Sequence, residues 1–221
     1  MKKSRKKAET EAKEKSKAKG ILQKIWYFIW EDNSVWSWIA NIILAFILIK
    51  FVVYPGLGYA LSTSHPVVAV VSGSMEHDGS FDQWWNSNAI CNHSLCTQKE
   101  FYNSIGINKT RFRSFIFKNG FNTGDIIILH GIEPEKIGIG DVIVFNSDLN
   151  YPIIHRVIKK EYKNNRIYFT TKGDHNEFSG KEDKNISQDK VIGKAIFRIP
   201  YLGRIKMVFA KALSIFGINM K

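Results

Sequence analysis

Residues 36–61 contain no acidic side chain and only one basic side chain, Lys50, although the 221-residue chain carries a formal net charge of +12. The lack of charge over this length excludes an ordinary polar surface segment. About 20 consecutive apolar residues are enough to cross a bilayer, and aromatic residues flank the stretch on both sides, as at a membrane interface. The sequence therefore predicts a transmembrane anchor over residues 35–61.

The charge that this stretch lacks is concentrated before it. Residues 2–19 contain nine Lys or Arg and three Glu, which gives half of the net charge. Such a run is typical of a solvated, partly disordered tail. The positive-inside rule places residues 1–34, a basic tail followed by an interfacial segment, on the cytoplasmic side of a cell membrane. Because topology explains the basic excess, no nucleic-acid partner is predicted.

A cleavable signal peptide is the alternative to an anchor, because Ala60-Leu61-Ser62 resembles a small-residue cleavage site. The apolar stretch is longer than the usual 7–15 residues of a signal peptide, and the region before it is unusually long. An anchor is therefore favoured, with everything after residue 61 extracytoplasmic.

Cysteine is scarce, with only Cys91 and Cys96 in the chain. Both fall in the extracytoplasmic part, where a disulfide is favoured. Free thiols are the alternative interpretation. A metal site that also uses His93 lacks a fourth ligand, so it is the weakest of the three interpretations and no metal is predicted.

Residues 62–203 show no alternation of strands with helices, which argues against a doubly wound sheet. They contain short β-prone runs bounded by turn residues, at 66–71, 126–130, 142–145, 152–159, 166–171 and 191–198. This spacing predicts a mainly β domain, an antiparallel β-sandwich or small barrel.

Two segments do not follow that pattern. Residues 76–119 are polar and rich in aromatic side chains, and we expect an insertion or cap that is partly helical around residues 98–117. Residues 204–221 are apolar with interspersed basic side chains. They are too short and too charged for a second span, so we expect an amphipathic helix on the membrane surface.

The run PVVAVV ends at Ser72-Gly73-Ser74-Met75, where a turn is the ordinary interpretation and a nucleophile the alternative. A serine nucleophile needs a base, either His or Lys. His155 is the one histidine in a strongly apolar, β-prone run, and Asp174 follows another such run in a Gly-Asp turn. Spacing alone therefore suggests Ser/His/Asp chemistry without establishing it.

The order of several segments resembles signal peptidase I. These segments are SGSM at 72–75, GDVIVF at 140–145, IIHRV at 153–157, TKGDHN at 171–176 and VIGKAIFRIPYLG at 191–203. The His-Arg-Val segment is similar to the archaeal and endoplasmic-reticulum branch, in which histidine replaces the lysine base. The resemblance covers the anchor and most of residues 66–203, but neither the insertion nor the basic tail.

The resemblance implies a role for each matching residue. Ser74 matches the nucleophile and His155 the general base. Ser72 matches a donor of the oxyanion hole, and Met75 an apolar residue near the membrane surface.

The acid has two candidates, because the related branch has a second aspartate six residues after that of its Gly-Asp-Asn-Asn motif. Here Asp174 is the first aspartate, but Gly180 stands six positions further on. Either a longer loop brings Asp183 into the role, or Asp174 orients His155 directly.

The resemblance implies a membrane-anchored serine endopeptidase that removes signal peptides from secretory precursors after small residues. It implies no metal or organic cofactor, and accessory subunits are a possible addition. Two alternatives stay open: a Ser/Lys peptidase of the same fold, with Lys159 or Lys160 as base, and a non-catalytic membrane-anchored binding subunit.

Overall fold

The computed structural model describes residues 20–149 and 151–201, which form parts of two compact units, Met1–Gly56 and Leu57–Lys221. The predicted disordered tail and the predicted C-terminal interfacial helix over 204–221 lie outside the described residues.

The apolar stretch is helical throughout. Residues 20–30 form one helix, and a second begins after Ser34, whose side chain accepts a hydrogen bond from the Ser37 backbone N–H. The second helix consists of α2 (Val35–Leu48), a π-helical turn η1 (Ile49–Val53) and α3 (Tyr54–Ala60). Together, Val35–Ala60 form one helix that is long and apolar enough to cross a membrane, by length and composition.

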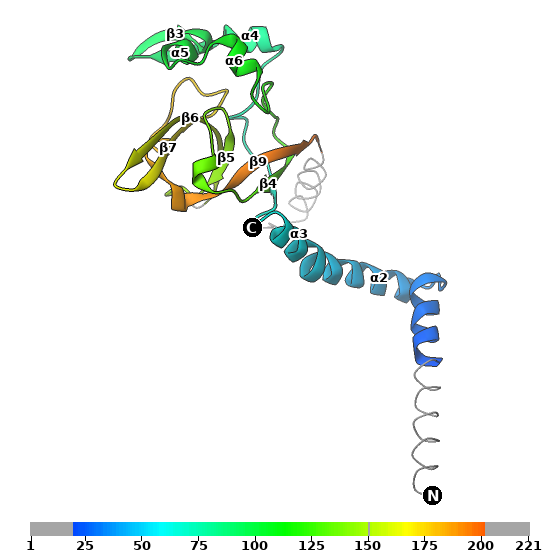
Figure 1. The fold of residues 1–221 in the computed structure, drawn as a ribbon. Helices are drawn as coiled ribbons and strands as arrows, with labels where there is room; N and C mark the ends of the chain where they lie inside the picture. Colours follow the sequence, from blue (N-terminus) through cyan, green and yellow to red (C-terminus); the bar gives the residue numbers. More distant parts are fainter. Residues whose placement is uncertain (1–19, 150, 202–221) are drawn as a thin grey trace, which may run out of the picture. The chain divides into compact units, whose positions relative to one another are not determined.

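The second unit is built on one curled antiparallel sheet (Figure 1). Its strand order is β1-β4-β9-β5-β6-β7-β8, and every pair in it is antiparallel. The strands are β1 (Val67–Ala69), β4 (Ile126–His130), β5 (Val142–Phe145), β6 (Ile153–Lys163), β7 (Arg166–Lys172), β8 (Ile186–Ser187) and β9 (Val191–Ile199). The mainly β, antiparallel prediction is confirmed. Within the described residues these strands form a single sheet rather than two facing sheets.

Strand β5 explains how one sheet can enclose its own core. Neighbouring residues of a strand point to opposite faces, and all four residues of β5 are buried. Val142 and Val144 pack in one apolar cluster, whereas Ile143 and Phe145 pack in a second. Irregular registers in the pairs β4–β9, β5–β9 and β6–β7 bend the strands, because a bulge increases local twist.

The insertion, residues 76–119, lies to one side of the sheet (Figure 1). It contains α4 (Phe81–Trp85), the hairpin β2 (Asn88–Cys91) and β3 (Ser94–Thr97), α5 (Gln98–Ser104) and α6 (Lys109–Arg113). Its buried side chains form an aromatic cluster, centred on Trp84, Trp85, Tyr102 and Phe112, that also includes Ile158 of β6. The partly helical expectation matches α5 and α6. The hairpin is not predicted from the sequence.

The hairpin turns at Asn92 and His93, which both have positive φ, 48° and 68°. Two consecutive positive φ values are the requirement of a tight type I′ turn, which joins antiparallel strands without splaying them. The turn brings Cys91 and Cys96 together, and they form a disulfide. The favoured interpretation of these cysteines, a disulfide, is therefore confirmed.

Candidate active site

Ser74 lies in the turn that follows β1, and its backbone is held on both sides. The Ser74 carbonyl oxygen accepts a 2.9 Å hydrogen bond from the His175 N–H, and the Met75 carbonyl accepts one of 3.0 Å from the Phe121 N–H. The Ser72 and Ser74 hydroxyls lie 3.3 Å apart. The turn thus presents two neighbouring hydroxyls on a fixed backbone.

His155 projects from β6 and meets Asp183. Its Nδ1 lies 2.6 Å from Asp183 Oδ1, and the imidazole is nearly buried. Asp183 also accepts hydrogen bonds from the Thr171 hydroxyl at 2.5 Å and from the Gly180 N–H at 3.0 Å. Burial by itself raises the pKa of Asp183, but the hydrogen bond from His155, the charge of the protonated His155 ring, and the hydrogen bonds from Thr171 and Gly180 together outweigh burial and lower the pKa. An ionised Asp183 fixes a proton on Nδ1 and leaves Nε2 as an acceptor.

Gly173 brings the serine turn and the histidine together. A Cβ placed on Gly173 would lie 2.7 Å from the Ser74 carbonyl oxygen and 2.8 Å from His155 Nε2. Both distances are shorter than real Cβ contacts allow. The free nitrogen of the imidazole and the backbone of Ser74 therefore both approach the same glycine.

Gly173→Ala is expected to lower any activity of this site about 100-fold, because even a 1 Å displacement of reacting groups can cost that much. The added methyl group must push either the Ser74 backbone or the His155 ring. The measurement is kcat beside that of Gly138→Ala, where a Cβ would meet nothing closer than 3.8 Å. Equal kcat for the two folded variants would contradict this prediction.

Asp174 occupies a different environment from Asp183. It is fully buried, and the Arg156 guanidinium donates to both of its carboxylate oxygens, at 2.8 and 2.6 Å. Burial raises the pKa of Asp174, but the charge and hydrogen bonds of Arg156 outweigh burial and hold the pKa well below its usual range. Among the hydrogen bonds of residues 20–149 and 151–201, none joins Asp174 to His155. Of the two acids left open by the sequence, Asp183 is the one that contacts the histidine.

Asp174 instead connects the insertion to the sheet. Its Oδ2 lies 3.0 Å from Nε2 of His77, whose ring stacks on Trp84 at a centroid distance of 3.7 Å. The Trp84 indole N–H donates to the Asp174 carbonyl at 2.9 Å. The sequence predicts no role for Arg156 or His77; its one signal for either residue is that Arg156 follows His155 directly.

Arg156→Met is expected to lower the free energy of unfolding by about 3–5 kcal/mol, because it leaves the Asp174 charge buried without its partner. The guanidinium also donates to the backbone carbonyls of Ile116, Phe117 and Gly140, which would lose that donor. Urea unfolding measures the change. Arg166→Met is the control, since its ion pair with Asp189 is exposed and worth little. Equal losses in both variants would contradict the prediction.

Met75 is the buried residue of the serine turn. Its side chain is fully buried in an apolar cluster of the sheet, and its sulfur lies 3.4 Å from the Asp174 N–H. A buried thioether has no surface to offer to lipid. Met75 therefore supports the serine turn from inside the domain, and its place near the membrane surface stays a prediction.

The lysines considered as alternative bases are held elsewhere. Lys160 Nζ donates to the carbonyls of Pro134, Glu135 and Ile137, and Lys159 pairs with Glu161. Neither contact includes Ser74. In the described part of the chain, no three His, Cys, Asp or Glu side chains are grouped so that they could hold a metal ion.

No family model matches the chain. It is similar to the signal peptidase complex catalytic subunit SEC11C of dog and of human, with 37% identity over 95 residues, which are 40% of this chain and 50% of each relative. It is also similar to the signal peptidase complex catalytic subunit SEC11 of Yarrowia lipolytica, with 23% identity over 169 residues, or 73% of each chain. The chain thus spans about half the length of the mammalian relatives and about three quarters of the fungal one.

Proposed function

We propose that this chain is a membrane-anchored serine endopeptidase that removes signal peptides from secretory precursors. The observation that carries the proposal is the 2.6 Å contact between His155 and Asp183, with His155 Nε2 and the Ser74 backbone both against Gly173. The names of the relatives, catalytic subunits of a signal peptidase complex, agree with it.

In the proposed reaction, the Ser74 hydroxyl attacks the scissile carbonyl carbon. Nε2 of His155 takes the hydroxyl proton and later gives it to the leaving amine, and a water then hydrolyses the acyl-enzyme by the same proton path. Asp183 holds the imidazole in the required tautomer and stabilises the imidazolium. The chemistry needs only these side chains and water.

The negative oxygen of the tetrahedral intermediate needs donors that are already in place. The Ser74 backbone N–H and the Ser72 hydroxyl are the proposed pair. Ser72 lies 3.3 Å from the Ser74 hydroxyl, which supports a position beside the reacting carbonyl.

The proposed substrate is an extended segment of a precursor that adds to the side of β1 facing away from β4, where no strand of the described residues pairs. Strand β1 is at one end of the sheet order and leads directly into the serine turn. Backbone hydrogen bonds supply affinity in such strand addition. The resemblance adds that only small side chains fit on either side of the cut.

The helix Val35–Ala60 is proposed as the anchor, with the peptidase unit on the extracytoplasmic side. Signal peptides are themselves inserted in the membrane, so an anchored enzyme meets them at a raised effective concentration. Because the relatives are named as subunits of a complex, accessory subunits are proposed as partners.

The test is cleavage of a signal-peptide precursor by the purified full chain in detergent micelles, with both products identified by mass. A single cut after a small residue is expected. If the chain is inert alone and also in membranes that contain candidate partner subunits, the binding-subunit alternative replaces the proposal. If His155→Ala cuts as fast as the parent chain, a lysine base replaces His155.

A further inference from the structure

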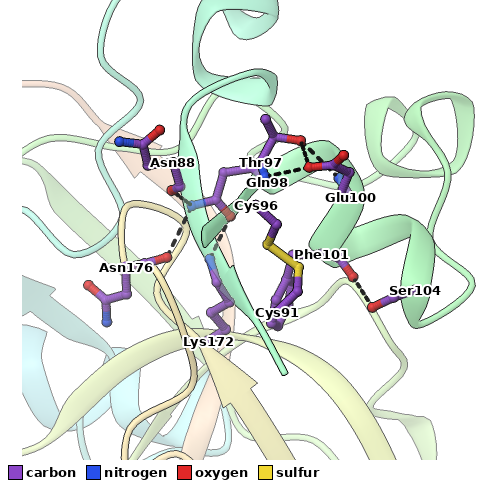
Figure 2. Close-up of a disulfide and its surroundings, with 10 residues drawn as sticks. All are labelled: Asn88, Cys91, Cys96, Thr97, Gln98, Glu100, Phe101, Ser104, Lys172 and Asn176. Carbon is purple, nitrogen blue, oxygen red and sulfur yellow. Dashed lines mark hydrogen bonds between the residues drawn. A yellow bond between two sulfur atoms is a disulfide. The ribbon is translucent and has the colours of Figure 1, made fainter. Parts of the chain in front are cut away.

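Lys172 is a buried charged group for which the proposed reaction has no use. Its side chain is fully buried at the end of β7, and its Nζ donates to Gln98 Oε1 at 2.8 Å and to the Gly173 carbonyl at 3.1 Å. The ammonium also lies over the rings of Phe101 and Tyr102, at 5.2 and 5.3 Å from their centroids. Figure 2 shows the side chain reaching toward Gln98 of the insertion, beside the disulfide.

Gln98 is itself buried and fully engaged. Its Nε2 donates to the carbonyls of Asn88 and Asn176, each at 3.1 Å (Figure 2). A second bond runs from the Ile90 N–H of β2 to the Glu177 carbonyl at 3.0 Å. The disulfide-closed hairpin and the first residue of α5 are thus attached to the turn after β7.

The three residues 171–173 connect that attachment to the site. The Thr171 hydroxyl donates to Asp183, and Gly173 lies against both the Ser74 carbonyl and His155 Nε2. Lys172, between them, contacts the insertion instead. One short segment therefore contacts all three proposed catalytic residues, and Lys172 is its link to the insertion.

We propose that Lys172 is a positioning residue: by bonding Gln98 and the Gly173 carbonyl, its ammonium fixes the segment 171–173 and thereby the mutual placement of Ser74, His155 and Asp183. This inference rests on the proposed function. The insertion then has a structural role in catalysis, because its residue Gln98 binds Lys172 and so holds the segment 171–173 in place.

The cost of a charge in this place supports the inference. Burial lowers the pKa of Lys172 to about 7, while Asp174 and Asp183 oppose the shift and Arg156 adds to it. An apolar side chain would avoid this cost but could not donate to Gln98 or Gly173. The ammonium therefore supplies directed contacts that packing alone cannot.

The first arm of the test compares Lys172→Met with Lys160→Met in precursor cleavage. Lys160 also donates to backbone carbonyls, but it contacts none of the residues 171–173. For Lys172→Met, kcat should fall about 10- to 100-fold with KM within about twofold, since misplaced reacting groups cost rate rather than binding. Lys160→Met should keep the kcat of the parent chain. The inference is overturned if both folded variants keep the kcat of the parent chain, or if Lys160→Met lowers kcat as much as Lys172→Met does.

The second arm needs no activity and separates this inference from the proposed function. Amide hydrogen exchange at His175, whose N–H donates to the Ser74 carbonyl, reports whether the segment is held. Lys172→Met should speed this exchange at least about tenfold relative to the parent chain and Lys160→Met. Unchanged exchange overturns the inference even if no precursor is cut. Gln98→Met removes the side-chain acceptor of Lys172 and should also speed exchange at His175. This variant replaces Lys172→Met in the test if Lys172→Met does not fold.

Discussion

Ser74→Ala is expected to lower kcat for precursor cleavage by about 10⁶-fold, because without the nucleophile the other two catalytic residues have nothing to activate. Ser72→Ala should lower kcat by only about 10²–10³-fold, the usual effect of losing one oxyanion-hole donor. The two hydroxyls lie 3.3 Å apart on the same turn. Because the two hydroxyls are so close, a difference in kcat between Ser74→Ala and Ser72→Ala reflects their chemical roles and not their positions.

The measurement is single-turnover cleavage with enzyme in excess over a labelled precursor, so that product release does not limit the rate. Ser64→Ala is a suitable control, since Ser64 is exposed and the one hydrogen bond of its hydroxyl within residues 20–149 and 151–201 is to the neighbouring His65. If Ser72→Ala were the inactive variant and Ser74→Ala the weakened one, the two roles would have to be exchanged.

The sheet could be predicted from the sequence because its strands carry local signals. Runs such as IIILH and VIVF are rich in β-branched residues, follow Gly-Asp turns, and form β4 and β5 at their predicted positions. The hairpin β2–β3 carries no such signal, since its turn residues are Asn92 and His93 and its strands are short and mixed. Its geometry depends on a disulfide and on contacts with residues 176–177, which are distant in sequence.

The site could be predicted only in part, for a similar reason. Ser74 and His155 each lie in a short recognisable segment, whereas the choice between Asp174 and Asp183 depends on how a loop folds. Motif spacing favours neither acid. The Arg156 guanidinium donates to both oxygens of Asp174, and His155 contacts Asp183, which supports Asp183 as the proposed acid.

Asp183→Asn is the second large effect expected, a fall in kcat of about 10⁴-fold with KM little changed. An amide in place of the carboxylate can donate to Nδ1 and so favours the tautomer that carries its proton on Nε2, which then cannot accept the serine proton. With the amide nitrogen in the place of Oδ1, the Thr171 hydroxyl can turn to accept from it, and the Gly180 N–H still meets the amide oxygen in the place of Oδ2. The fold should therefore survive the change.

Asp174→Asn is the matched comparison, since it makes the same chemical change at the other acid of this region. Its main effect should be on stability, because Arg156 loses the charge that compensates its own burial. Once rates are corrected for the folded fraction measured by urea unfolding, kcat should stay within about tenfold of the parent chain. A 10⁴-fold loss in folded Asp174→Asn together with near-normal kcat in Asp183→Asn would reverse the assignment. The charge on Asp174 would then have to act on His155 through a rearrangement of the Arg156 contacts during the reaction.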